Sequence, residues 1–231
     1  MISLLKLEFK KFNIWRYGIS FLIITAAILS LTVLIGAVEL DEDTMVTSSQ
    51  ELMAISDIFI RLTFTIVSGV LISKLIISEF KNSTIKIMFT YPISRKKIIG
   101  AKLIIIWTLI FTAIILENLL IAAGLKIIDS SSSVLPIPIT YSDITARIPV
   151  ILYSALINAG LSLIPLYFGM RKKSTTTTIV ASVIVSFLIN GSINGQETSL
   201  YTITVIPVLL CLSGVLIAFI SYCNIEKTDI N

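Results

Sequence analysis

The chain has 231 residues, of which 55% are hydrophobic and 14% charged, with a net charge of +4 and a mean hydropathy of +0.97. A soluble globular domain carries about a quarter charged residues. Here the excess apolar residues fall in long blocks, so the composition excludes an ordinary soluble domain and predicts an integral membrane protein. The chain contains no histidine, which removes the commonest metal ligand and proton shuttle.

The first segment, residues 1–16, predicts an amphipathic helix on the inner membrane surface. Its apolar residues recur at helical spacings of three and four, at Ile2, Leu5, Phe9 and Phe12. Its lysines fall on the opposite face, which suits an interfacial anchor. A contact surface for a partner is the alternative interpretation.

Six apolar segments follow, each near the roughly 20 residues that a helix needs to cross the hydrocarbon core. They cover residues 17–38, 61–78, 98–125, 148–170, 175–194 and 200–224. The sequence therefore predicts an all-α integral membrane fold of six transmembrane helices, organised as a single domain over residues 1–231. Pro165 and Pro207 predict kinks inside the fourth and sixth helices.

The distribution of lysine and arginine predicts that both termini lie in the cytoplasm. The basic residues of the N-terminal segment, of the connector between the second and third spans, of residues 171–173 and of the C-terminal tail all fall on one side. The other side carries Arg61, Lys126 and Arg147. The first outer loop is expected to be acidic and to contain Glu51 and Asp57.

The connector after the second span is longer than two adjacent helices need. Its first half places Ile85, Met88 and Phe89 along one edge of a helix, and Pro92 ends that helix by pushing Tyr91 out of the helical conformation. The pattern predicts a short amphipathic helix beneath the membrane, where a cytoplasmic partner can reach it. A basic loop that only fixes the topology is the alternative.

The order of residues in this connector resembles that of type-2 ATP-binding-cassette (ABC) exporter permeases. The matching positions are Glu79, Thr84, Pro92, Ser94, Arg95 and Lys102. The resemblance implies that residues 79–97 form a coupling helix that docks onto a separate ATPase subunit. The implied contact residues are Glu79, Thr84, Ile85, Met88, Phe89, Tyr91, Pro92, Ser94 and Arg95. The family often has glycine where Ser83 stands, and the connection at residues 191–199 is short for an elaborate outer gate.

The same resemblance implies the partners and the function. The chain would be the permease subunit of an exporter in a bacterial cell membrane, paired with a second copy or with a sister permease. It would bind no cofactor itself, because ATP and Mg²⁺ would sit on the ATPase subunit. The cargo would be hydrophobic or amphipathic, and antimicrobial-peptide export or resistance follows by analogy only.

Two groups of polar residues within the spans are candidates for a cargo path. Glu117 and Asn118 interrupt the third span, where an ionisable residue is costly. The fifth span carries a polar stripe made of Thr178, Ser182, Ser186 and Asn190. The alternative for Glu117 is an ion pair with Arg61, Arg147 or Lys126, and the alternative for the stripe is helix packing.

Several chemistries are excluded by missing motifs. Residues 169–174 do not form a phosphate-binding loop, and there is no H-E-x-x-H, G-x-S-x-G or C-x-x-C motif. We therefore predict no catalytic residue, no metal site and no enzymatic activity in this chain. The competing functions are an ion-coupled secondary transporter and a non-transporting immunity or sensor protein that binds a cationic peptide at the acidic residues 39–57.

Overall fold

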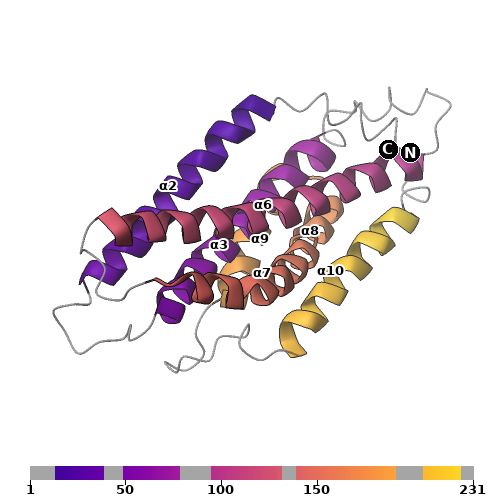
Figure 1. Cartoon of the computed structure of the whole chain (residues 1–231). Helices are drawn as coiled ribbons and strands as arrows, with labels where there is room; N and C mark the ends of the chain where they lie inside the picture. Colours follow the sequence, from indigo (N-terminus) through magenta and orange to yellow (C-terminus); the bar gives the residue numbers. More distant parts are fainter. Residues whose placement is uncertain (1–13, 39–48, 79–94, 132–138, 191–204, 225–231) are drawn as a thin grey trace. The chain divides into compact units, whose positions relative to one another are not determined.

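The computed structural model describes residues 14–38, 49–78, 95–131, 139–190 and 205–224. The expected interfacial helix and nearly all of the expected coupling segment lie outside these residues. Every regular element within them is helical, and Figure 1 shows their order. The helices are α2 (Ile14–Val38), α3 (Ser49–Ile72), η1 (Ser73–Ile77), α6 (Arg95–Ser131), α7 (Tyr141–Leu161), α8 (Pro165–Lys172), α9 (Thr175–Asn190) and α10 (Val205–Asn224).

The all-α membrane fold is confirmed. Four stretches are long and apolar enough to cross a membrane, and two further apolar helices are shorter. The long stretches are Gly18–Ala37, Ser49–Ile77, Ile98–Ser130 and Tyr141–Lys172, and the shorter ones are Thr175–Asn190 and Val205–Ser221. Each of the six predicted spans overlaps one of these helical stretches.

Two helices begin earlier than predicted. The second begins at Ser49 rather than at residue 61, so Glu51 and Asp57 lie in α3 and not in an outer loop. The fourth begins at Tyr141 rather than at residue 148. Charged residues near each start lower the local hydropathy, so these first turns did not look like parts of a membrane span. In the structure, charges of this kind are neutralised by partners on another helix.

One of the two predicted kinks is present. At Pro165 the helix breaks between α7 and α8, and the chain passes through a tight turn in which the backbone N–H of Ile164 donates to the carbonyl of Leu161 at 3.0 Å. The kink at Pro207 stays a prediction, because α10 is described only from Val205 onward and the residues before it lie outside the described part of the chain.

The described residues group into two compact units. One contains the described parts of Leu62–Phe111 and Leu156–Asn231, and the other contains α2, residues 49–61 and the described part of Thr112–Ala155. The division passes through α3, α6 and α7 themselves, so it does not fall at a linker.

In the first unit, helices approach one another at glycines. A Cβ on Gly214 of α10 would lie 2.1 Å from the carbonyl oxygen of Gly160 in α7, and a Cβ on Gly160 would lie 2.3 Å from Sγ of Cys211. Small residues at such crossings let backbones approach closely, which drives helix association where no hydrophobic force acts between helices. Ile157, Leu161 and Ile189 form a buried cluster in the same unit.

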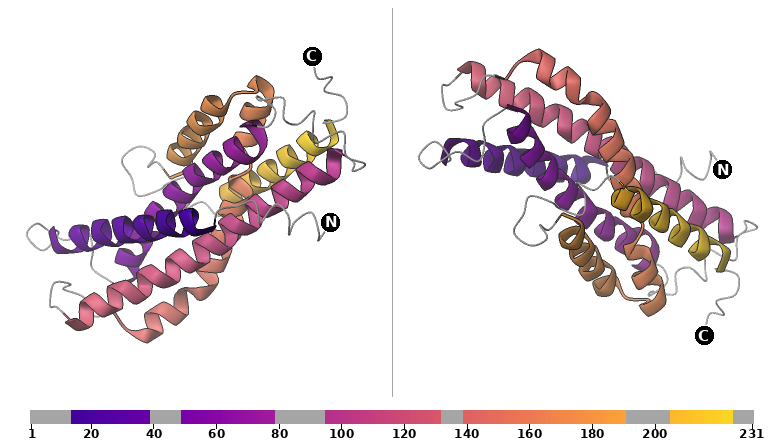
Figure 2. Two further views of the ribbon diagram at one scale, coloured as in Figure 1. Left: turned by 90° about the horizontal axis from the view of Figure 1, so that it is seen from above. Right: turned by 90° about the horizontal axis from the view of Figure 1, so that it is seen from below.

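The helices α8 and α9 also belong to this unit and lie side by side (Figure 2). The chain turns between them at Lys173, whose φ of 47° places it in the left-handed region. A residue in this conformation commonly ends a helix. Within the described chain, it is the one non-glycine residue with positive φ.

We predict that Gly214→Ala destabilises the protein. The new methyl group would meet a backbone oxygen, which cannot move aside as a flexible side chain can, so α10 must shift. Overpacking of this kind costs about 1–3 kcal/mol. Thermal unfolding in detergent should show a lower Tm for this variant. Gly18→Ala is the matched control, because a Cβ there meets nothing within 4 Å. Equal Tm values for the two variants would contradict the close crossing.

Candidate functional site

Most of the predicted coupling residues lie outside the described part of the chain. These are Glu79, Thr84, Ile85, Met88, Phe89, Tyr91, Pro92 and Ser94, whereas Arg95 is the first residue of α6. The structure does describe the two helix ends between which this segment runs. We call them the stems: η1 with Ser78 on one side, and the first turns of α6, Arg95–Lys102, on the other.

The two stems are joined by a buried lysine. The side chain of Lys102 is 2% exposed, and its Nζ donates a hydrogen bond to the carbonyl oxygen of Leu75 at 2.9 Å. Leu75 lies within η1, a π-helical turn at the end of α3. A hydrogen bond from a charged donor to a backbone carbonyl is stronger than one between neutral groups. An ammonium group is therefore a favourable partner at this place.

The neighbouring carbonyls of η1 are satisfied as well. The backbone N–H of Ser78 donates to the carbonyl of Ser73, and the hydroxyl of Ser78 donates to the carbonyl of Lys74 at 2.5 Å. Three successive carbonyls therefore each have a donor, and the third donor comes from α6. The family resemblance drew attention to Lys102 but did not indicate that its partner would lie in a π turn.

The candidate Glu117 belongs to the second unit and is completely buried. Its Oε2 accepts a hydrogen bond at 2.9 Å from the hydroxyl of Thr25 in α2, and that hydroxyl also lies 3.0 Å from the carbonyl oxygen of Phe21. Its Oε1 is buried and has no hydrogen-bond partner within the described residues. The expected ion pair of Glu117 with Arg61, Arg147 or Lys126 is wrong in this structure, since Thr25 takes that place.

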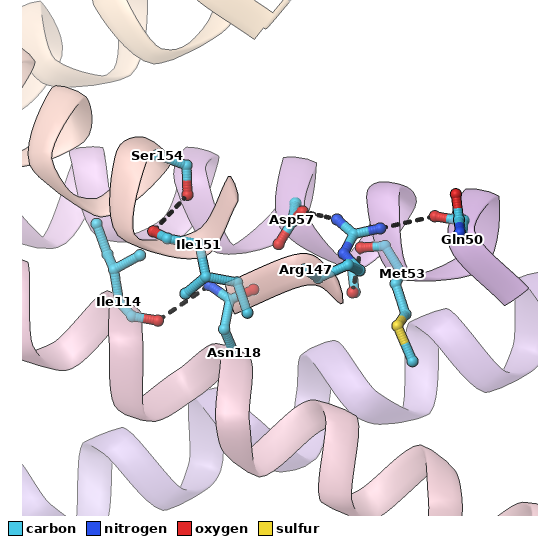
Figure 3. Close-up of polar contacts among 9 residues, drawn as sticks. Gln50, Met53, Asp57, Ile114, Asn118, Arg147, Ile151 and Ser154 are labelled. Carbon is cyan, nitrogen blue, oxygen red and sulfur yellow. Dashed lines mark hydrogen bonds and ion pairs between the residues drawn. The ribbon is translucent and has the colours of Figure 1, made fainter. Parts of the chain in front are cut away.

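Two of the three expected partners interact elsewhere. Arg147 donates to the carboxylate of Asp57 and, through Nη1, to the carbonyl oxygen of Gln50 at 2.7 Å (Figure 3). The ammonium of Lys126 lies over the ring of Tyr141, 2.8 Å from its centroid. A cation above an aromatic face is held by the ring quadrupole.

The pair of Arg147 and Asp57 is the polar connection that sequence reasoning missed. It fastens the first part of α7 to the first part of α3, and the hydroxyl of Ser49 adds a bond to Asp143 at 3.1 Å. A signal was present in the sequence. Asp57 follows Met53 by four residues and precedes Ile60 by three, so it falls on an apolar helix face and needs a cation there.

Asn118, the neighbour of Glu117, lies next to this pair. Its amide Nδ2 donates to the carbonyl of Ile114 at 3.0 Å (Figure 3). It lines a hollow of ≈ 10 Å³ together with Ser56, Asp57 and Arg147. A hollow of this size holds about one water molecule. It leaves no room for a cargo molecule in the conformation described.

The polar stripe of the fifth span lies in the first unit and is directed into packing contacts. Thr178, Ser182 and Ser186 are fully buried, and each hydroxyl donates to a carbonyl of its own helix or of Ser174 just before it, at 2.7–3.2 Å. Asn190 donates to the carbonyl of Ser186 at 2.9 Å. A Cβ on Gly69 would lie 2.2 Å from Oγ of Ser182. Packing is therefore what this stripe does here, and its role in a cargo path stays a prediction.

The described residues contain no group of three His, Cys, Asp or Glu side chains arranged to hold a metal ion. The two candidate groups for a cargo path, Glu117 with Asn118 and the stripe of α9, fall in different units. In each group, the hydrogen bonds named above for the polar side chains are made to residues of the same unit.

We predict that Arg147→Met strongly lowers stability. The change leaves the carboxylate of Asp57 buried without its cation, which costs about 3–5 kcal/mol. A lower Tm in detergent should show this loss. The double variant Arg147→Met/Asp57→Leu removes both charges and should recover much of it. A double variant no more stable than Arg147→Met would contradict the assignment of the loss to the unpaired carboxylate.

We predict that Glu117→Gln keeps the stability of the unchanged protein. Glutamine has the same shape and its amide oxygen still accepts from Thr25, while the described residues offer the carboxyl no cation. Glu117→Ala should lower the Tm, because it removes buried atoms and leaves a cavity. If glutamine is as harmful as alanine, the charge of Glu117 has a partner beyond the residues described.

The comparisons with known proteins place the chain in a family. The model of the family described as "ABC-2 family transporter protein" matches residues 4–190. A protein of Bacillus subtilis (strain 168), described as "Uncharacterized protein YcbO", is 36% identical over 229 residues, covering 99% of this chain and 100% of the relative. No solved structure matches the chain.

The family match extends over most of the sequence, from the N-terminal segment through α9, and includes both stems and the segment between them. The helices that it covers include all four that are long and apolar enough to span a membrane. This multi-pass membrane protein therefore belongs to the ABC-2 family of transporter proteins.

Proposed function

We propose that the chain is the permease subunit of an ABC exporter and moves a hydrophobic or amphipathic cargo out of the cytoplasm. The observation that carries the proposal is the family match over residues 4–190. The chain itself has no phosphate-binding loop, so the energy comes from ATP and Mg²⁺ on a separate ATPase subunit. A second permease copy or a sister permease completes the transporter.

The proposed mechanism is alternating access driven from the cytoplasm. Closure of the ATPase dimer around ATP pushes the coupling helix at residues 79–97, and the membrane helices move as bodies. Glu79, Thr84, Ile85, Met88, Phe89, Tyr91, Pro92, Ser94 and Arg95 make the contact. The proposal is supported by the order of these residues and by the buried Lys102, which joins the two stems.

The proposed cargo class rests on the apolar character of the helices. The described spans expose mainly large aliphatic and aromatic side chains, whereas Glu117 is buried. A path along such helices favours a hydrophobic or amphipathic molecule over a small ion. An antimicrobial peptide is the cargo that we consider first, and resistance to such a peptide is the physiological role that it would give.

The competing functions gain no support from the fold. The peptide-binding sensor depended on an acidic outer loop at residues 39–57. Of its acids, Asp57 is buried in α3 and paired with Arg147, and those at 39–43 lie outside the described residues. The ion-coupled transporter depended on ionisable groups in a midplane cavity. Glu117 is the strongest such group, and its free oxygen atom is enclosed by protein.

We predict that an ATPase subunit co-purifies with the chain from native membranes. Thr84→Pro should abolish the capture by breaking the coupling helix, and Arg95→Glu should weaken it by reversing a contact charge. Mass spectrometry of the purified complex identifies the ATPase. Lys172→Glu is the matched control, because this exposed lysine at the end of α8 lies outside the proposed contact.

Size-exclusion profiles of the variants separate loss of contact from loss of folding. Export that persists without any ATPase and follows a proton or sodium gradient would overturn the proposed function in favour of a secondary transporter.

A further inference from the structure

We infer that Lys102 is a positioning residue that makes the end of α3 and the beginning of α6 move as one body. The inference rests on the proposed function, since it concerns how force from an ATPase enters the membrane helices. The role that we infer for Lys102 does not require contact with nucleotide or cargo. It acts through the carbonyl oxygen of Leu75, which it contacts at 2.9 Å.

The first step of the argument is that this hydrogen bond is difficult to break. The side chain of Lys102 is 2% exposed, and water cannot readily replace a lost acceptor there. Breaking a hydrogen bond of a buried ammonium group is far more costly than breaking that of an exposed one. The joint therefore has only a narrow choice of arrangements while both helices stay folded.

The second step is that the acceptor belongs to an unusual turn. Because η1 is a π turn, it departs from the regular α-helical ladder, and its carbonyls are satisfied one by one. The N–H and hydroxyl of Ser78 take the carbonyls of Ser73 and Lys74, and Lys102 takes that of Leu75. The acceptor site at the end of α3 therefore matches a cation from α6.

The third step is that η1 is also held from its other side. It contacts α8 and α9, and a Cβ on Gly169 would lie 3.0 Å from Ile77 and 2.2 Å from Oγ1 of Thr178. The residues Ile76 and Ile77 are both buried. A displacement of the α6 stem would therefore pass through Lys102 to η1, and from η1 to the pair of helices α8 and α9.

These contacts link the two stems directly to each other. Without the bond of Lys102, a displacement of one stem would not have to displace the other. With it, a push on either stem displaces both. Leucine or methionine at position 102 would fill much of the space there but could not donate to Leu75.

The experiment measures the separation of the stems directly. Spin labels are placed on Lys74→Cys and Ile104→Cys, two exposed positions on η1 and α6, in a Cys211→Ser/Cys223→Ser background. Distances are recorded by pulsed electron spin resonance on the complex with its ATPase, without nucleotide and after trapping with Mg-ATP and vanadate. Three versions are compared: Lys102, Lys102→Met and Lys102→Arg.

With Lys102, we expect one narrow distance distribution that is the same in both nucleotide states. Lys102→Met should broaden this distribution and shift it when ATP is trapped. Lys102→Arg should restore the narrow form, because a guanidinium group also donates to a carbonyl. Lys126→Met is the control and should behave as the unchanged protein, because this lysine lies near the other end of α6, outside the stems, α8 and α9.

Two results would overturn the inference. One is a Lys102→Met distribution as narrow and as insensitive to ATP as that of the unchanged protein. The other is a stem separation that changes with ATP while Lys102 is present. Both are read only on a complex that retains its ATPase, so they are distinct from a failure of the proposed function, in which the unchanged chain captures no ATPase at all.

Discussion

The fold depends on one constraint, which is that a polar group inside a membrane must find its partner within the protein. No water is present in the bilayer core to take its place. The chain meets this constraint by linking helices that are distant in sequence: Lys102 with Leu75, Arg147 with Asp57, and Thr25 with Glu117. In each case the link decides which helix faces lie together. Apolar contact alone would not, because lipid tails satisfy an isoleucine as well as a neighbouring helix does.

Much of the architecture could be predicted from the sequence because hydropathy reports burial in lipid directly. The helices, the break at Pro165 and the packing alternative for the α9 stripe followed from composition and spacing. The starts of α3 and α7 did not. There a charge lies on a helix face that is otherwise apolar, and one sequence gives no means of knowing that Arg147 stands opposite Asp57.

The candidate site was predictable only in part, for a related reason. The short pattern around residues 79–102 indicated the family, which the comparison with the family model confirms. The π turn at Ser73–Ile77 has no sequence signature, so the partner of Lys102 could not be found from spacing. Glu117 was expected to attract a cation because such a charge is costly, but a threonine hydroxyl from α2 lies there instead. The energetic cost of burying a charged group shows that it needs a partner but does not identify which residue that partner is.

The π turn at the end of α3 also bears on how a long helix can be adjusted without being melted. Such a turn holds one residue more than an α turn, so it can migrate along the helix or be absorbed into the regular ladder. Each residue in an α-helix advances by about 100° of rotation, given 3.6 residues per turn. Absorbing the extra residue would therefore turn Ser78 somewhat more than a quarter of the way around the axis while nearly all the hydrogen bonds of the helix stay in place. A small change of register at this point is equivalent to a large change of direction for whatever is attached beyond it.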